Sequence, residues 1–209
     1  MSADASPARG EASPYLHLVL RTGSIPPTAL KEMEKELADQ MRAAGFVTDW
    51  EDPQRYDAVD GYMVIIDLDG DCRVPFHADL GSEVPVQGVH IGTTATAGGD
   101  ILPFINVDCE ALRTLLTPLV TDEPETSRDY AMGRSIGRVL AHELYHFLSQ
   151  SEDHPDSGLA KSRFSGSDLM KYKFEFDQSA LTRMQPAPVV ESAPEVVVAS
   201  EGSIETGLK

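Results

Sequence analysis

Two histidines and a glutamate stand within five consecutive residues, in the pattern HExxH, at His142, Glu143 and His146. Residues four apart on a helix lie one above the other on the same face, so both imidazoles can reach one tetrahedral metal ion. Glu143 lies about 100° further round the helix, beside the metal rather than on it. A carboxylate there can take a proton from a water that the metal has made more acidic. The spacing predicts a hydrolytic zinc site with His142 and His146 as ligands and Glu143 as the base.

The surroundings of the motif favour a metal-binding helix over a chance match. A bare HExxH has many false positives, so its context must decide. The two residues inside the motif, Leu144 and Tyr145, are uncharged, and the residues on either side are apolar: Val139, Leu140, Phe147 and Leu148. A core helix that merely happens to carry two histidines would also have to explain a glutamate near its buried face.

Residues 139–148 resemble the helix signature of the zincin metallopeptidases. The resemblance implies Zn²⁺ as the cofactor, a peptide or protein substrate, and a sheet whose exposed edge strand aligns that substrate. Residues 84–95 could supply such a strand. In metzincins the signature continues as HExxHxxGxxH. This sequence departs from it, because Ser149 stands at the glycine position and Glu152 at the position of the third histidine.

A zinc site for hydrolysis needs a third protein ligand and one open position. His154 is the nearest histidine after the motif, eight residues beyond His146, and the proline and glycine that follow it indicate that the helix has ended. We expect His154 to bind through a longer turn than in metzincins. Glu152 is the next candidate, followed by a more distant carboxylate such as Asp168 or Glu175.

Other residues could contribute to such a site. The resemblance to metzincins implies a methionine turn beneath the metal, for which Met170 is a candidate and Met184 the alternative. Groups that could polarise the substrate are Lys161, Arg163 and Tyr172. The remaining three histidines are isolated in sequence, and we interpret them as structural: His17, His77 and His90.

Periodicity predicts the elements that would position these residues. Alternating leucines predict a strand over 15–20, and a continuous apolar run predicts a central strand over 62–68. Weaker patterns predict strands at about 46–50, at 84–95 as an exposed edge strand, and at 101–107. The stretch TTATAGG at 93–99 lacks the lysine of a phosphate loop, and we interpret it as a turn.

Three helices are predicted from apolar residues three or four positions apart. The first opens at Ser24 and the prolines after it and ends at Gly45. Asp108 is expected to cap a short second helix. The third runs over about 127–149 and contains the motif, with Gly133 and Gly137 expected to pack closely against the sheet.

This order of elements predicts an α+β or mixed α/β fold, as one zincin-like domain with a mixed sheet, a backing helix and a long active-site helix. The domain is expected to span residues 14–184. The flanking segments 1–13 and 185–209 lack a sustained period, and we interpret them as disordered tails.

Composition narrows the possible partners. Asp and Glu outnumber Lys and Arg by 34 to 17, so the surface field would repel phosphate backbones, and nucleic acid is not expected as a partner. The longest apolar run, 62–66, is too short to span a bilayer. The N-terminus shows no secretory leader, which favours the cytoplasm by default, or secretion if a leader has been removed.

Cys72 and Cys109 stand neither in a CxxC pair nor beside a histidine cluster, so they are poor candidates for metal ligands. We interpret them as two buried thiols. The alternative is a single disulfide, which requires an oxidising compartment.

The pattern as a whole predicts a zinc-dependent metallopeptidase. The alternative is a catalytically inactive, zinc-stabilised binding module, which would agree with the missing metzincin glycine and histidine. An intact Glu143 favours the enzyme, since a structural site would close its fourth position with another Cys or His. A third possibility, a metal-free interaction protein with acidic tails, leaves both histidines of the motif unexplained.

Overall fold

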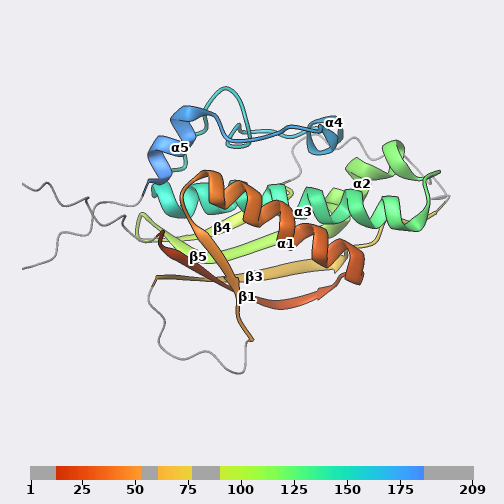
Figure 1. Cartoon of the computed structure of the whole chain (residues 1–209), viewed down its shortest axis with the longest axis horizontal. Coiled ribbons are helices and arrows are strands. Elements are labelled where there is room, and N and C mark those ends of the chain that lie inside the picture. Colours follow the sequence, from red (N-terminus) through yellow and green to blue (C-terminus); the bar gives the residue numbers. More distant parts are fainter. Residues whose placement is uncertain (1–12, 53–60, 77–89, 186–209) are drawn as a thin grey trace, which may run out of the picture.

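A five-stranded mixed sheet carries its long helices on one face (Figure 1). The computed structural model describes residues 13–52, 61–76 and 90–185. The strands lie in the order β2-β1-β3-β5-β4. Four are parallel: β1 (Tyr15–Ser24), β2 (Val47–Trp50), β3 (Tyr62–Asp71) and β5 (Asp100–Asp108). The fifth, β4 (Gly92–Ala97), pairs antiparallel to β5 at the edge of the sheet.

Each of the five predicted strands has a counterpart in the sheet, with β1, β2 and β5 at or near the predicted 15–20, 46–50 and 101–107. The apolar run at 62–68 lies in the central strand β3, whose side chains at Val64, Ile66 and Leu68 are at most 2% exposed. The predicted edge strand is β4, although it begins only at Gly92, and residues 84–89 lie outside the part of the chain described. The interpretation of 93–99 as a turn is wrong. The strand continues to Ala97, and the turn is confined to the two glycines that follow.

Helix α1 (Pro27–Ala43) backs the sheet with one apolar stripe. Met33, Leu37 and Met41 are fully buried, as their spacing predicts. A proline opens the helix, and Gly45, with a φ of 91°, lets the chain leave it in a left-handed conformation.

Helix α2 (Cys109–Val120) begins where predicted. The Asp108 carboxylate accepts a hydrogen bond of 2.9 Å from the backbone N–H of Ala111, which is the expected N-cap. Two short helices follow later in the chain and were not predicted, namely α4 (Gly166–Met170) and α5 (Gln178–Met184).

The long helix α3 (Glu125–Ser149) has 25 residues and contains the HExxH motif. It starts two residues before the predicted boundary and ends at the predicted one. The segment that carries α4 and α5 lies on the side of α3 that faces away from the sheet (Figure 1). None of the helices in the described ranges is long and apolar enough to cross a membrane.

The two glycines of α3 pack against α1, not against the sheet as the sequence suggested. A Cβ at Gly133 would lie 2.1 Å from the backbone oxygen of Ala29, and one at Gly137 would lie 2.8 Å from that of Met33. Both glycines therefore let the backbones of two helices approach closely. Helical spacing shows that a small face exists, but it does not say which element lies against that face.

The two cysteines form a disulfide between the end of β3 and the start of α2, so the interpretation as two thiols is wrong. The parallel pairing of β3 with β5 aligns Asp69 with Asp108, which brings Cys72 and Cys109 to a Cα–Cα distance of 4.8 Å. Both side chains are fully buried. The sequence alone does not show that these two strands are neighbours.

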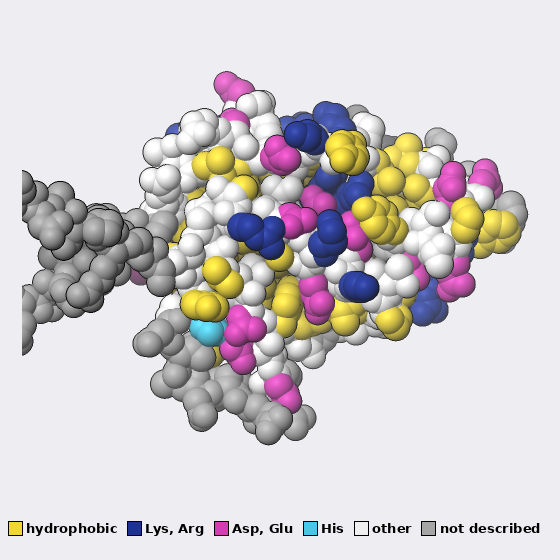
Figure 2. Space-filling view, in the orientation of Figure 1, with side chains coloured by type: hydrophobic (Ala, Val, Ile, Leu, Met, Phe, Trp, Pro, Cys, Tyr) yellow, Lys and Arg dark blue, Asp and Glu magenta, His cyan; other side chains and the backbone are white. Residues whose placement is uncertain are grey.

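The acidic excess of the chain does not gather into one patch on the face in view in Figure 2. Lys and Arg side chains alternate there with Asp and Glu. On α1, Asp39 bonds both Lys35 at 3.1 Å and Arg42 at 2.7 Å. The predicted tails, apart from residues 13 and 185, lie outside the described ranges, and the domain limits remain a prediction.

The packing of α3 on α1 predicts the sign of a glycine substitution. In an open helix Gly→Ala stabilises by about 1 kcal/mol. Gly133→Ala should instead lower the free energy of unfolding by about 1–3 kcal/mol, because the new methyl group meets the Ala29 carbonyl. Urea denaturation measures this, with the exposed Ser127→Ala on the same helix as a control that should change little. A stabilised Gly133→Ala variant would contradict the close contact.

Candidate metal centre

Helix α3 presents His142, Glu143 and His146 from its buried side. Their exposed fractions are only 8%, 6% and 9%, so all three are held in a largely desolvated place. The helix stops directly after them, because Gln150 takes a left-handed conformation with a φ of 46°. Its side-chain amide accepts from the N–H of Ile101 at 3.1 Å and donates to the Ile101 oxygen at 3.0 Å. This double hydrogen bond fixes the end of α3 to β5.

The chain beyond α3 turns back and brings His154 to the two helical histidines. The Tyr145 hydroxyl donates to the Asp153 oxygen at 3.1 Å, which holds the turn against the helix. The Nε2 atom of His146 lies 3.1 Å from the Nε2 atoms of both His142 and His154. One ring nitrogen from each of the three histidines lies within 4.8 Å of the others, so together they could hold a metal ion.

Hydrogen bonds fix the tautomers of the two helical histidines. Nδ1 of His142 lies 2.9 Å from the backbone oxygen of Leu159, and Nδ1 of His146 lies 2.7 Å from that of Ser151. A carbonyl oxygen only accepts, so in each ring the hydrogen is on Nδ1. In the neutral ring Nε2 then carries a lone pair. The nitrogens that face one another are those free to bind a metal.

Burial favours the neutral form of His142 and His154. Desolvation lowers the pKa of His142 to about 3, against a weaker opposing effect of the Leu159 hydrogen bond. Desolvation and the neighbouring His146 also lower the pKa of His154, although that side chain is exposed. Metal binding to histidine needs the neutral imidazole, so the site is prepared for it at neutral pH.

The spacing of the nitrogens suits a tetrahedral ion. Zinc–nitrogen bonds of about 2.1 Å at tetrahedral angles place neighbouring ligand atoms about 3.4 Å apart. The two observed separations of 3.1 Å come close to that value. Three imidazoles also suit copper, iron and nickel, so the arrangement indicates a metal ion without naming it.

The edge strand β4 holds the Glu143 carboxylate in place. The hydroxyl of Thr94 on β4 donates to Glu143 Oε2 at 2.7 Å. Burial raises the pKa of Glu143 to about 7, and the Thr94 hydrogen bond opposes that rise. A dication on the nearby histidines would favour the ionised form and lower this pKa again. With a metal ion bound, Glu143 would therefore be ionised and able to accept a proton.

Glycine at position 92 lets the edge strand approach this carboxylate. A Cβ there would lie 2.5 Å from Val139 Cγ1 and 2.7 Å from Glu143 Oε1. The small residue at position 92 thus permits close contact between β4 and α3. Any larger side chain would displace either the strand or the carboxylate.

A cleft of about 1020 Å³ opens over these groups. Residues of β4 form one wall, including Thr93 and Thr96, and the segment after α3 forms another with Phe164. The Phe164 ring packs edge-on against His142, with 5.0 Å between ring centroids. The three histidines and Glu143 all line this cleft.

The other ligand candidates from the sequence are not part of the three-histidine cluster. Glu152 lines the cleft but is not part of the three-histidine cluster. Asp168 binds Lys161 and Lys171, both at 2.7 Å; burial alone would raise its pKa, but these lysines and Ser165 lower it. Glu175 is exposed and does not line the cleft.

The methionine and tyrosine candidates do not line the cleft that holds the histidines. Met170 lines a separate hollow with Leu119 and Tyr130, at the other end of α3, so it does not lie beneath the site. Met184 is buried in the core. Tyr172 is 88% exposed and does not line the cleft, whereas Lys161 and Arg163 do.

The isolated histidines have different surroundings. His90 is exposed and lines the cleft. His17 on β1 bonds Glu51 at 2.8 Å and, with Asp49, forms a second group of possible ligand atoms at the β1–β2 edge, in which Asp49 is exposed. His77 lies outside the described residues.

Sequence reasoning missed the groups that orient the site. Thr94, Leu159 and Ser151 act through one hydroxyl and two backbone carbonyls, and these leave no pattern in the sequence. Their roles depend on long-range folding that a single sequence does not reveal.

No protein-family model and no curated protein matches this chain.

The geometry predicts that His154 contributes to metal affinity and that His90 does not. Loss of an outer partner of a metal ligand typically costs about 10–100-fold in affinity, and loss of a ligand should cost at least as much. His154→Ala should therefore weaken Zn²⁺ binding by about 100-fold or more in competition with a chromophoric chelator. His90→Ala, in the same cleft, is the matched control. Equal affinities for the two variants would exclude His154 from the site.

The buried Glu143 predicts how the stability of the metal-free protein depends on pH. Its folded pKa is raised from 4.5 to about 7, so the folded state holds the proton and loses stability as the pH rises through that range. The effect is about 1.4 kcal/mol per pKa unit. Between pH 4.5 and pH 8 the free energy of unfolding of Glu143→Gln should therefore rise by up to about 3 kcal/mol relative to that of the wild type. Urea denaturation at both pH values measures this gain. A difference that does not change with pH would contradict the raised pKa.

Proposed function

We propose that this chain is a zinc-dependent metallopeptidase. The observation that supports this most is the convergence of three imidazole nitrogens with a separately held carboxylate in one cleft. His142, His146 and His154 would be the ligands, and Glu143 the catalytic base. Three protein ligands leave a fourth position open, which is typical of catalytic rather than structural zinc.

Zinc is the metal that this donor set and spacing suit best among those that need no redox chemistry. When bound, it would supply Lewis acidity that polarises a substrate carbonyl and makes a water more acidic. The protein contributes the fixed ring orientations, through carbonyls that hold each Nδ1 hydrogen, and a largely dry wall around the site.

Glu143 would move the proton in the reaction. Thr94 occupies its Oε2 atom and leaves Oε1 as an acceptor, so the carboxylate can take a proton from the attacking water and later pass it to the leaving amine. The hydrogen bond from β4 also stops the side chain from rotating away.

A peptide substrate fits the position of the edge strand. Among the described residues β4 pairs with β5 alone, and it supplies several residues to the wall of the cleft. An extended peptide can add to such an edge through main-chain hydrogen bonds. Of the two cations that line the cleft, Lys161 is bound by Asp168, which leaves Arg163 for a substrate carbonyl or carboxylate.

The test compares Glu143→Gln with Glu152→Gln. Gln keeps the shape of Glu143 and loses its basicity, so peptide hydrolysis should fall by about 10²–10⁴-fold while the zinc content stays the same. Glu152 lines the same cleft outside the histidine cluster, and its variant should keep both zinc and activity. Zinc-loaded protein would be offered a broad peptide library, with the cleavage products read by mass spectrometry.

The alternative is the inactive, zinc-stabilised binding module. It would be supported if the zinc-loaded wild type cleaves nothing above the Glu143→Gln background. Loss of zinc from Glu143→Gln would contradict the separation of base and ligands.

A further inference from the structure

Arg138 is a fully buried cation on α3, one helical turn before His142. Only 1% of it is exposed, and it is among the largest fully buried side chains in the described residues. Arginine is almost never fully buried unless it is paired. The proposed chemistry does not use Arg138 directly, so its burial needs another explanation.

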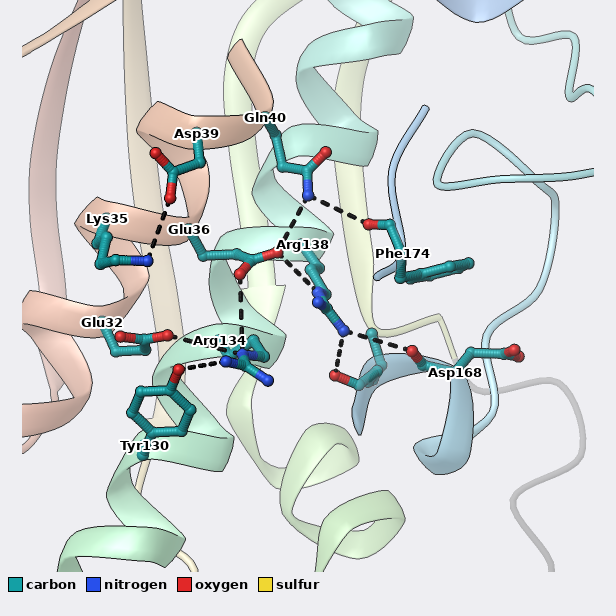
Figure 3. Close-up of polar contacts among 11 residues, drawn as sticks. Glu32, Lys35, Glu36, Asp39, Gln40, Tyr130, Arg134, Arg138, Asp168 and Phe174 are labelled. Carbon is teal, nitrogen blue, oxygen red and sulfur yellow. Dashed lines mark hydrogen bonds and ion pairs between the residues drawn. The ribbon is translucent and has the colours of Figure 1, made fainter. Parts of the chain in front are cut away.

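The guanidinium bridges three elements (Figure 3). Its Nε donates to Glu36 Oε1 on α1 at 2.8 Å, and its Nη1 donates to the backbone oxygen of Leu169 at 2.7 Å. Gln40 on α1 extends the contact, because its amide nitrogen donates to Glu36 at 3.0 Å and to the Phe174 oxygen at 3.1 Å. Side chains of α1 and α3 thus hold two carbonyls of the segment that follows α3.

That same segment orients His142. Leu159 is part of this segment, and its N–H donates to the Glu175 oxygen at 3.0 Å. The backbone oxygen of Leu159 accepts the hydrogen bond from His142 Nδ1. Phe164 packs against both the His142 ring and Phe174, with 5.0 and 5.5 Å between centroids. A short path of contacts therefore runs from Arg138 through residues 159–175 to His142.

We propose that Arg138 is a positioning residue for the metal centre. It holds residues 159–175 against α3, so that the Leu159 carbonyl keeps the hydrogen of His142 on Nδ1 and leaves Nε2 free for the metal. The inference rests on the proposed metal site, but its effect on the His142 ring exists without any metal. Arginine suits this task because its planar guanidinium presents several donors in a fixed fork, whereas the lysine ammonium is a compact point charge on a flexible stem.

If Arg138 only stabilised the fold, an apolar side chain of similar volume could replace it. Replacing a buried ion pair by apolar residues of similar volume is often neutral or stabilising. Arg134 provides the comparison within the same network. It lies 3.6 Å from Glu32 and 3.8 Å from Glu36, one turn before Arg138 on α3, and bonds neither of the two carbonyls (Figure 3).

The experiment compares Arg138→Met with Arg134→Met in the full chain. In the metal-free proteins, nitrogen NMR of the His142 ring reports which nitrogen carries the hydrogen. The wild type and Arg134→Met should show the single Nδ1–H tautomer, and Arg138→Met should show a mixture. Zn²⁺ affinity, measured against a chromophoric chelator, should fall by about 10-fold or more in Arg138→Met, as for loss of an outer partner. Arg134→Met should stay within about 3-fold of the wild type.

The outcomes separate the two proposals. A folded Arg138→Met that keeps the single His142 tautomer and the wild-type zinc affinity overturns the positioning role. If Arg138→Met does not fold, Arg138→Lys decides, because lysine keeps the charge beside Glu36 but should still release the His142 tautomer. If the wild type binds no Zn²⁺, the proposed function falls, and the tautomer measurement alone upholds or overturns the role of Arg138.

Discussion

The candidate metal centre depends on two imidazole nitrogens, Nε2 of His142 and of His146, that face one another. Two backbone carbonyls take the Nδ1 hydrogens of His142 and His146, so the lone pairs on Nε2 meet across 3.1 Å. A cation between the rings would accept both lone pairs, so the contact has the arrangement of a metal site.

The rest of the fold serves to hold that contact in place. Close packing of α3 on α1 through Gly133 fixes the helix, and Gln150 fixes its end to β5. Thr94 approaches from the edge strand, and the segment after α3 approaches from the opposite side with Leu159. Each of these contacts is long-range in sequence, so the centre forms only when the whole domain has folded. The buried charges on α1 and α3 join the backing helix to the segment that orients His142.

The sequence was sufficient where a repeating pattern carried the information. The stripe of α1, the apolar run in β3, the Asp108 cap and the motif helix α3 follow local rules of period and capping, and all are present. His154 lies beside His146, as expected for the nearest histidine after the motif. The predictions failed where the partner of a residue was in question. Gly133 packs on a helix instead of the sheet, and the two cysteines meet only because β3 and β5 are neighbours. Backbone carbonyls such as that of Leu159 leave no trace in residue types at all.

In the proposed site three histidines hold zinc with one position open. X-ray absorption at the zinc edge of the loaded protein reports the type and number of atoms bound to the metal. The spectrum should show three imidazole nitrogens and one light oxygen ligand at about 2.0–2.1 Å, with no sulfur. A sulfur shell at about 2.3 Å, or a zinc with fewer than three imidazoles, would contradict the proposed site.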